Sequence, residues 1–253
     1  MRRGASWMLW TSCALAGPSA VAAPCVRVSV SDLVDEAAAQ PASIVVLGER
    51  HGHAGDLNRA ARVVAGLLAK DASARVTVAL EAVAEGRGEV VSLWRAGNRA
   101  DDLEALLDWS VSWGFDYAPY RPLLEASSDR VDVVEAGPPL SKRPEDAFFP
   151  VPPNYGEALQ AMFGADAHPV TREFVAAMAW RDHRIASLAI EGWLGADGTP
   201  RGPLVVVTGR GHVEGGLGVA WQAQRLRPEA RVIGATLGLG GAARCGDDDR
   251  YLR

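Results

Sequence analysis

The sequence predicts a three-layer αβα fold with a mainly parallel central sheet. Five short apolar runs are rich in valine and isoleucine. Most of them are continuous rather than alternating, as is typical of strands covered on both faces. Segments with helical spacing of apolar residues separate these runs. Strand–helix alternation of this kind indicates a parallel sheet with helices on both sides.

The five predicted strands are short and bounded by turn residues or charged residues. In chain order they are Ile44–Leu47, Val76–Leu80, Val131–Val134, Leu204–Val207 and Val232–Leu237.

A helix is predicted after the first strand, because apolar residues recur at helical spacing from Leu57 to Leu68. Asp56 directly precedes this pattern and is expected to be its N-cap. Five further segments with helical spacing follow, at Leu103–Trp109, Pro122–Ala126, Glu157–Phe163, Thr171–Trp193 and Leu217–Leu226.

Residues 1–22 are predicted to be a secretory signal peptide, which leaves residues 23–253 as a single exported domain. A basic start, Met1-Arg2-Arg3, precedes an apolar stretch and a small-x-small cleavage site, Ala20-Val21-Ala22. The apolar stretch is too short to span a bilayer, which takes about 18 or more apolar residues. No later segment approaches that length. We therefore expect a periplasmic or secreted protein with no transmembrane segment in the mature chain.

Cys25 and Cys245 are the two cysteines that remain after removal of the signal peptide. In an oxidising compartment they are candidates for a disulfide, and two unpaired thiols are the alternative. Cys13 lies inside the apolar stretch. Trp10-Thr11-Ser12 precedes it instead of the leucine and small residues of a lipobox, so we do not expect lipidation there.

The charge balance argues against a nucleic-acid partner. The chain carries a formal net charge of −5. Binding to nucleic acid requires a basic face that neutralises phosphates. The balance leaves open a small ligand held in a local site.

Charged side chains and histidines follow several predicted strands, at the point where each strand ends. Glu49 and His51 follow the first strand, Glu81 the second and His212 the fourth. Ligands of parallel α/β sheets bind outside the carboxyl ends of the strands, so we expect these four side chains to gather at one edge. A glycine three residues before each histidine permits the sharp turn that brings the imidazole back over the sheet.

This set of side chains is compatible with metal chemistry. Two imidazoles with one or two carboxylates suit Zn, Mn, Fe or Co and leave a position for water or substrate. On this interpretation His51 and His212 are metal ligands, and Glu49 or Glu81 is a general base. The alternative is that both histidines form hydrogen bonds in loops and both glutamates form salt bridges.

Three further residues are candidates for ligand binding near the strand ends. His53 is expected to line the site; the alternatives are a metal ligand, a proton shuttle and a mobile loop residue. Arg181 falls within the apolar stripe of the predicted helix Thr171–Trp193, and Asp182 lies at its edge. A charged pair on a buried face needs a partner or a function. This pair is expected to brace the strand-end loops or hold an anionic group, and a structural ion pair is the alternative.

An aromatic-rich segment precedes the third strand. Its rings, Trp109, Trp113, Phe115, Tyr117 and Tyr120, fall within twelve residues of sequence. They are expected either to pack a helix–loop–helix or to form a flat apolar wall for a planar ligand.

The second interpretation of the aromatic segment implies haem. Tyrosinate is a known axial ligand of haem iron, which makes Tyr117 and Tyr120 candidates for that role. Arg50 and Arg210 are then candidates to face the propionates, because guanidinium groups bind carboxylates in bidentate fashion.

These residues resemble a known family. The segments "VVLGERH", "VALE", "WGFDYAPYRPLL", "RDHRIA" and "VVVTGRGHV" occur in the order and spacing of the ChaN-like haem-binding uptake proteins. That family belongs to a broader group with the Tiki metalloproteases and the erythromycin-esterase-like enzymes. The resemblance extends over residues 43–237. It assigns site positions to Glu49, His51, Glu81, Arg181, Asp182 and His212.

The resemblance implies an αβα fold with its site at the carboxyl ends of the strands and haem or iron binding at the bacterial envelope. It also suggests a homodimer with haem between two protomers. The segment "HGHAGDLN" departs from the family pattern, which carries Asp-Asn before a second histidine. A second-histidine role therefore falls to His53, if to any residue.

The leading interpretation is an exported haem- or iron-binding protein. The alternatives are a hydrolase that depends on a divalent transition metal, and an envelope protein of the same fold that binds neither.

Overall fold

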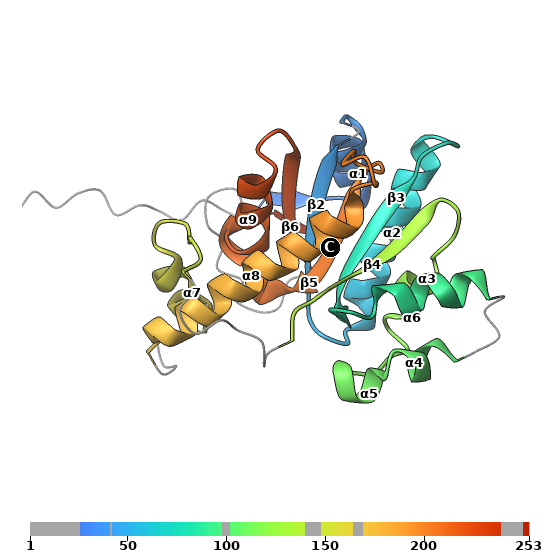
Figure 1. Cartoon of the computed structure of the whole chain (residues 1–253). Coiled ribbons are helices and arrows are strands. Elements are labelled where there is room, and N and C mark those ends of the chain that lie inside the picture. The colour runs from blue at the N-terminus through green and yellow to red at the C-terminus, as the bar shows by residue number, and fades with distance from the viewer. Residues whose placement is uncertain are drawn as a thin grey trace, which may run out of the picture.

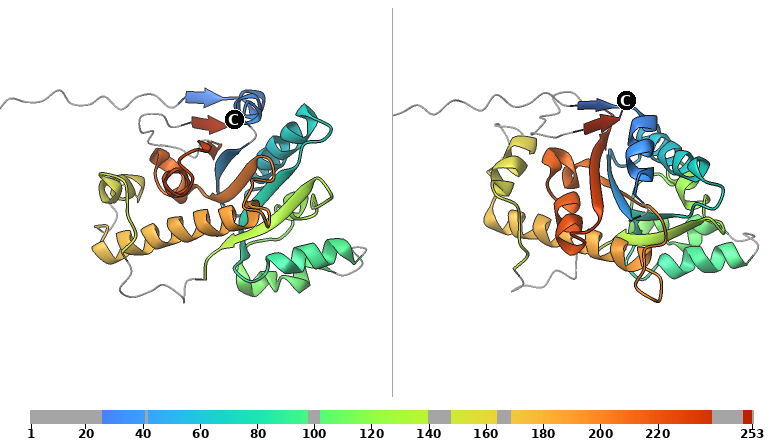
Figure 2. Two further views of the ribbon diagram at one scale, coloured as in Figure 1. Left: turned by 45° about the horizontal axis from the view of Figure 1, so that its top comes forward. Right: turned by 90° about the horizontal axis from the view of Figure 1, so that it is seen from above.

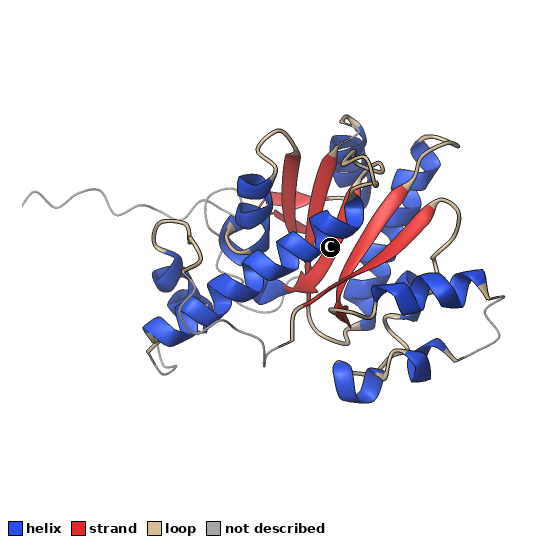
Figure 3. Cartoon of the chain, viewed as in Figure 1, coloured by secondary structure: helices blue, strands red, loops and turns tan. Residues whose placement is uncertain are grey.

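The computed structural model describes residues 26–40, 42–97, 102–139, 148–163, 169–238 and 250–252. Within them the chain forms one sheet with helices on both faces, which confirms the predicted αβα fold (Figures 1 and 3). The predicted signal peptide and the three cysteines lie outside the described residues. No helix among the described residues is long and apolar enough to cross a membrane.

In the described part of the chain the sheet contains seven strands in the order β1-β7-β6-β2-β5-β3-β4, and its strand pairs are parallel. The strands are β1 (Val26–Val28), β2 (Ser43–Glu49), β3 (Val76–Ala84), β4 (Val131–Gly137), β5 (Leu204–Gly209), β6 (Arg231–Leu237) and β7 (Arg250–Leu252). The five predicted strands are confirmed as β2 to β6. The three-residue strands β1 and β7 were not predicted.

Each predicted helical segment overlaps a helix of the structure, whereas α1 (Val30–Ala38) and α3 (Gly88–Ala96) were not predicted. The α-helices are α1 (Val30–Ala38), α2 (Ala54–Lys70), α3 (Gly88–Ala96), α4 (Leu103–Leu106), α5 (Trp109–Ser112), α6 (Arg121–Leu124), α7 (Tyr155–Phe163), α8 (Arg172–Trp193) and α9 (Val219–Leu226). Short 3₁₀ helices, η2 (Arg210–His212) and η3 (Glu214–Gly216), follow β5.

Two helix predictions were wrong in detail. The predicted helix Leu103–Trp109 is broken between α4 and α5, where Asp108 has φ = 53°, outside the helical region. The N-cap of α2 is His53 rather than Asp56. The Nδ1 atom of His53 accepts a hydrogen bond from the backbone N–H of Asp56 at 3.2 Å. Asp56 lies in the first turn, where its negative charge also suits the helix dipole.

Each face of the sheet has its own apolar core. Val45 and Val205 pack on one face with α1 and α2, and Val46 and Val206 pack on the other with α8 and α9. Figure 2 shows these two helix pairs on opposite sides of the sheet. The alternation explains why β2 and β5 read as continuous apolar runs: successive side chains point to opposite faces, and both faces are covered.

The strand order brings three strand ends together. β5 lies between β2 and β3, with Glu49 of β2 in register with Gly209 of β5. Leu80 of β3 is in register with Val207 of β5, so Glu81 lies beside the end of β5. The segments that leave these three strands therefore form one neighbourhood at the carboxyl edge of the sheet.

Candidate functional site

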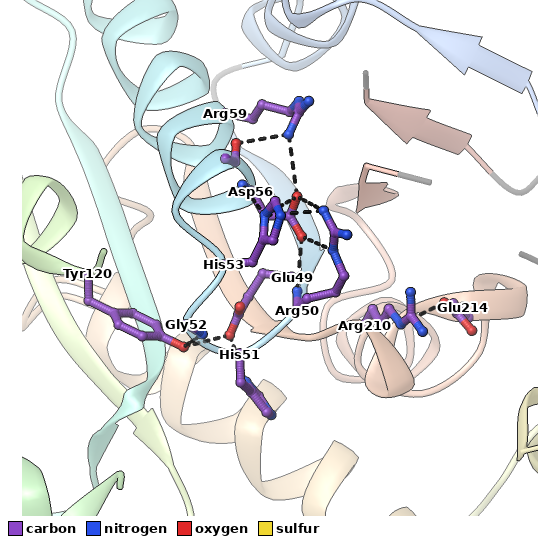
Figure 4. A network of polar contacts seen from close by, with 11 residues as sticks. Glu49, Arg50, His51, Gly52, His53, Asp56, Arg59, Tyr120, Arg210 and Glu214 are labelled. Atoms are coloured by element: carbon purple, nitrogen blue, oxygen red, sulfur yellow. Dashed lines mark hydrogen bonds and ion pairs between the residues drawn. The ribbon is translucent and has the colours of Figure 1, made fainter. Parts of the chain in front are cut away.

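Glu49 connects a tyrosine to a histidine at the end of β2. Its Oε1 accepts a hydrogen bond from the Tyr120 hydroxyl at 2.9 Å and lies 2.7 Å from the His51 Nδ1 (Figure 4). Because a carboxylate only accepts, we assign the imidazole proton to Nδ1. This leaves Nε2 of neutral His51 with a free lone pair. We call Tyr120, Glu49 and His51 the His51 triplet.

His51 is the partly exposed member of this triplet. One third (33%) of its side chain is exposed, whereas Glu49 is 2% exposed. The ring of Trp113 meets the imidazole edge-on at 4.8 Å between centroids, and Phe115 packs against it at 5.0 Å. A methyl group on Gly209 would lie 2.9 Å from Nε2, so the glycine provides the room that the imidazole occupies.

A second triplet of a tyrosine, a carboxylate and a histidine lies beside the first. The Nδ1 atom of His212 lies 2.6 Å from Oδ1 of Asp182, whose other oxygen accepts a hydrogen bond from the Tyr155 hydroxyl. We call Tyr155, Asp182 and His212 the His212 triplet. Its members come from α7, α8 and η2. His212 is only 8% exposed, and its Nε2 lies 3.7 Å from Oε1 of Glu81.

Glu81 is the buried anion of the site. It accepts hydrogen bonds from the Thr208 hydroxyl at 2.6 Å, from the Gly209 N–H at 2.8 Å and from Arg181 at 2.5 Å. Burial opposes its charge, but the positive charges of His212 and Arg181 lower the pKa of the Glu81 carboxyl to about 2. The group is therefore an anion at neutral pH.

Glu81 in turn affects the protonation of His212. Burial disfavours the imidazolium, but the charge of Glu81 and the hydrogen bond to Asp182 raise the pKa of His212 above its usual value. Arg181 also donates to the carbonyl of Pro138 at 3.4 Å. The structure thus brings Arg181 and Asp182 to the strand ends, each bonded to a different strand-end residue.

A third polar cluster lies at the start of α2, on the other side of Glu49 (Figure 4). Arg50 makes a bidentate pair with the fully buried Asp56, at 2.9 Å for each contact. His53 lies 3.1 Å from the Arg50 guanidinium. These contacts fix Arg50 and His53 to the helix terminus. Arg210 lies apart from this cluster and pairs with Glu214 at 3.4 Å, with 41% of its side chain exposed.

The two tyrosines proposed as haem ligands are buried. Tyr120 is 1% exposed and Tyr117 is 7% exposed. Burial raises the pKa of the Tyr117 phenol to about 12. Burial and the charge of Glu49 raise the pKa of Tyr120 as well. Both phenols therefore hold their protons firmly and face the protein interior.

The geometry gives no support for a metal site made of protein side chains. Within the described ranges, no group of three or more His, Cys, Asp or Glu side chains is placed to hold a metal ion. The metal-ligand prediction for His51 and His212, and the hydrolase that would depend on it, therefore remain without structural support.

Some contributors to the site were not apparent from the sequence. Tyr155 bonds to Asp182 although it lies 27 positions away in a separate helix. Thr208 and the Gly209 backbone bind Glu81 from the neighbouring strand. Strand-end position was the one available signal for Thr208 and Gly209, and nothing in the local sequence pattern marks Tyr155.

Comparison with protein-family models shows which family the chain belongs to. The family model described as "Haem-binding uptake, Tiki superfamily, ChaN" matches residues 36–143 and 132–223. The chain belongs to this family. No curated protein matches the chain.

Among solved structures, that of "Cofacial heme binding to ChaN of Campylobacter jejuni" matches with a TM-score of 0.64 and 15% identity. The match covers 84% of this chain and 87% of the Campylobacter chain. The type III effector HopBA1 is more distant, with a TM-score of 0.48 and 14% identity over 89% of each chain. At this identity the Campylobacter ChaN likeness establishes a shared fold.

Proposed function

We propose that this ChaN-family protein binds haem at the carboxyl edge of the sheet, with Nε2 of His51 as the axial ligand of the iron. The observation that carries the proposal is the His51 triplet: a partly exposed imidazole whose Nδ1 is bonded to a buried carboxylate. Haem-ligating histidines in proteins are oriented by such a hydrogen bond on the second ring nitrogen. The family match supports haem as the ligand.

The site chemistry fits haem better than a bare metal ion. One imidazole nitrogen would suffice to hold the iron of a haem, because the porphyrin brings nitrogen ligands of its own. Trp113 and Phe115 flank that imidazole with aromatic surface, which suits a flat apolar ligand. Bound haem would supply an iron centre that this imidazole ligates.

Exposure favours His51 over the other candidate ligands. His212 is buried and its Nε2 is directed at Glu81. Tyr120 is buried and its hydroxyl is engaged with Glu49. We therefore place Tyr120 behind His51 rather than on the iron. Arg210, exposed and one residue past Gly209, is the better propionate partner, because Arg50 is already held by Asp56.

The test is a hemin titration followed in the Soret band. We expect saturable binding by the wild-type protein and at least about tenfold weaker binding by His51→Ala, since about 1.4 kcal/mol corresponds to tenfold in affinity. The matched control is His53→Asn, which removes a neighbouring exposed imidazole and keeps an N-cap for α2. Equal affinities for His51→Ala and wild type would refute the assignment.

We further propose that haem is bound between two copies of the chain. Phe115, which packs against His51, is 43% exposed, and two further apolar side chains of the preceding helices are exposed, Val111 at 80% and Leu106 at 40%. Exposed apolar residues next to a ligand site are typical of an interaction surface. Cofacial haem binding by the ChaN protein of Campylobacter jejuni supports this arrangement. Sedimentation with and without hemin tests it: Val111→Asp should abolish hemin-dependent association, and an unchanged monomer in the wild type would refute it.

Export to the periplasm or medium is the last part of the proposal. The basic start, apolar stretch and Ala20-Val21-Ala22 site support it. Expression of the full chain in a bacterial host, followed by N-terminal sequencing of the periplasmic fraction, should give a mature protein that starts at Ala23. Recovery of uncleaved protein in the cytosol would contradict it.

A further inference from the structure

Three arginines meet one carboxylate at the amino edge of the sheet, opposite the edge that holds His51. Arg75 directly precedes β3, Arg201 lies shortly before β5, and Arg95 lies in α3. Their guanidinium nitrogens lie 3.1, 3.8 and 3.5 Å from the carboxylate oxygens of Asp132, the second residue of β4. Three cations against one carboxylate leave two positive charges in excess.

The contacts of these guanidinium groups leave hydrogen-bond donors for a ligand. Arg75 donates to Asp132, and Arg95 donates to the carbonyl of Ser128. Arg201 contacts Asp132 at 3.8 Å, beyond hydrogen-bond distance. A guanidinium group has more N–H donors than these contacts use. Like charges held this close repel one another, and a bound anion would relieve that repulsion.

A cleft of about 470 Å³ lies beside two of these arginines, Arg75 and Arg201, which both line it. Its other walls are largely apolar and include Ala38, Leu67, Pro200 and Pro203. Gly202 permits the close packing of one wall: its φ is +89°, and a methyl group there would collide with the Arg75 carbonyl oxygen. A cleft of this size with apolar walls and a few polar groups is typical of a small-molecule site.

The two other charged side chains that line the cleft are already engaged. Lys70 pairs with Asp35. The carboxylate of Asp71 accepts hydrogen bonds from the backbone N–H and the hydroxyl of Ser73 at 2.7 and 2.8 Å. An anion in the cleft would therefore have the arginines as its main partners.

We propose that this cleft binds a phosphomonoester with an apolar chain. The phosphate contacts Arg75, Arg95 and Arg201, and the chain lies along the apolar walls. The site is on the opposite edge of the sheet from His51, so the inference does not depend on the proposed haem site.

Charge and shape decide the headgroup. A phosphomonoester carries about two negative charges at neutral pH, which match the two excess positive charges of the cluster. Its several oxygens can accept hydrogen bonds from more than one guanidinium group, and planar guanidinium groups bind phosphate in bidentate fashion. The apolar walls favour a ligand with a chain over inorganic phosphate alone.

The experiment is a calorimetric titration of the protein with octyl phosphate, with inorganic phosphate and octanol as the separate halves of that ligand. We expect saturable binding of octyl phosphate, at least about tenfold tighter than binding of either half, because the headgroup and the chain contribute together. Binding should weaken as the salt concentration rises, since the arginines are partly exposed.

Arg75→Gln and Arg201→Gln should each weaken octyl phosphate binding by about tenfold. Arg201→Lys keeps the charge but loses the planar fork and should also weaken it. The matched control is Arg172→Gln, which removes an exposed arginine at the start of α8 and should leave the affinity unchanged. Circular dichroism verifies that each variant is folded before titration.

A second measurement separates two sources of the same chemistry. Co-sedimentation with vesicles that contain phosphatidic acid, lost in Arg201→Gln, would identify a membrane lipid as the ligand. Octyl phosphate binding without vesicle binding would identify a free phosphomonoester. Equal affinities for octyl phosphate and inorganic phosphate, or equal losses in Arg172→Gln and Arg201→Gln, would overturn the inference. Loss of hemin binding in the Arg75 and Arg201 variants would do so as well, because it would place the cleft in the haem site.

Discussion

The two triplets share one chemistry and differ in their surroundings. In each, a tyrosine hydroxyl bonds a buried carboxylate, and that carboxylate bonds the Nδ1 atom of a histidine. The side chain of His51 is 33% exposed beside aromatic rings, whereas that of His212 is 10% exposed beside Glu81.

The difference indicates what each triplet is for. Nε2 of His212 faces an anion within the protein, so that triplet holds α7, α8 and the strand ends together through buried charge. No comparable anion is bonded to Nε2 of His51 among the described contacts, and its ring reaches solvent. We therefore propose that the same arrangement supports structure where the histidine is buried and ligand binding where it is partly exposed.

The largest expected difference in unfolding free energy is between the substitutions Glu81→Gln and Glu49→Gln. Glu81→Gln leaves Arg181 and His212 without their shared anion, and removal of one partner from a buried ion pair costs about 3–5 kcal/mol. Glu49→Gln alters hydrogen bonds to a phenol and an imidazole and should cost about 1–3 kcal/mol. Urea unfolding of both variants provides the comparison. Equal losses would mean that the two triplets are energetically alike.

Acid should lower the free energy of unfolding by protonating Glu81, which lies beside His212. Because the pKa of folded Glu81 is lowered from 4.5 to about 2, its stabilisation is complete above pH 4.5 and is lost as the pH falls toward 2. The loss is on the order of 3 kcal/mol. Unfolding free energies of wild type and Glu81→Gln across this range should converge at the acid end. Parallel curves would contradict the assignment.

Alanine substitutions at His212 and His51 should affect different properties: the first should lower stability and the second should weaken hemin binding. His212→Ala removes the imidazole that Asp182 contacts, while Glu81 keeps Arg181, so we expect a loss of about 2–3 kcal/mol in unfolding free energy. His51→Ala removes a partly exposed ring and should cost about 1 kcal/mol or less while hemin binding is lost. Urea denaturation and hemin titration of both variants measure these effects. A larger loss of unfolding free energy in His51→Ala than in His212→Ala would contradict the prediction.

Gly209→Ala tests the position of His51 without changing its chemistry. The backbone of Gly209, at φ −57° and ψ 138°, suits any residue, but the new methyl would lie 2.9 Å from Nε2. The displaced ring should bind hemin about tenfold more weakly, or ~1.4 kcal/mol. Gly211→Ala is the control, because its nearest side-chain atoms belong to Met162 at 3.5 Å. Equal effects of the two substitutions would remove the argument for close placement.

The smallest effect is expected at Arg210. It is exposed and already paired with Glu214, and an exposed ion pair is worth about 0.2–1 kcal/mol. Arg210→Ala should therefore weaken hemin binding by about fivefold or less, and less still at high salt. Titrations at two ionic strengths measure this. A large, salt-independent loss would instead place Arg210 in a buried contact.

The central strands and the helices that cover them could be predicted from the sequence because they follow from the pattern of apolar residues. The central strands are covered on both faces, so they read as unbroken runs, and their parallel arrangement fixed where Glu49, Glu81 and His212 would meet. β1 and β7 have three residues each, and too little pattern exists in them to detect.

The sequence did not predict which side chains of the site bond to one another, because these contacts depend on packing between elements that are distant in the chain. Asp182 and Tyr155 meet only because α7 lies against α8. Tyr120 reads as an available phenol in sequence, and its burial against Glu49 emerges only from the fold. Asp56 resembles an N-cap locally, but its carboxylate is engaged by Arg50 while His53 caps the helix.

The most direct test of the central claim is the resonance Raman spectrum of the hemin-loaded protein in its ferrous form. Iron bound by a histidine nitrogen gives an iron–imidazole stretching band. We predict this band in the wild type and in His212→Ala, and its loss in His51→Ala. A wild-type spectrum without the band, or a band that persists in His51→Ala, would show that another residue ligates the iron.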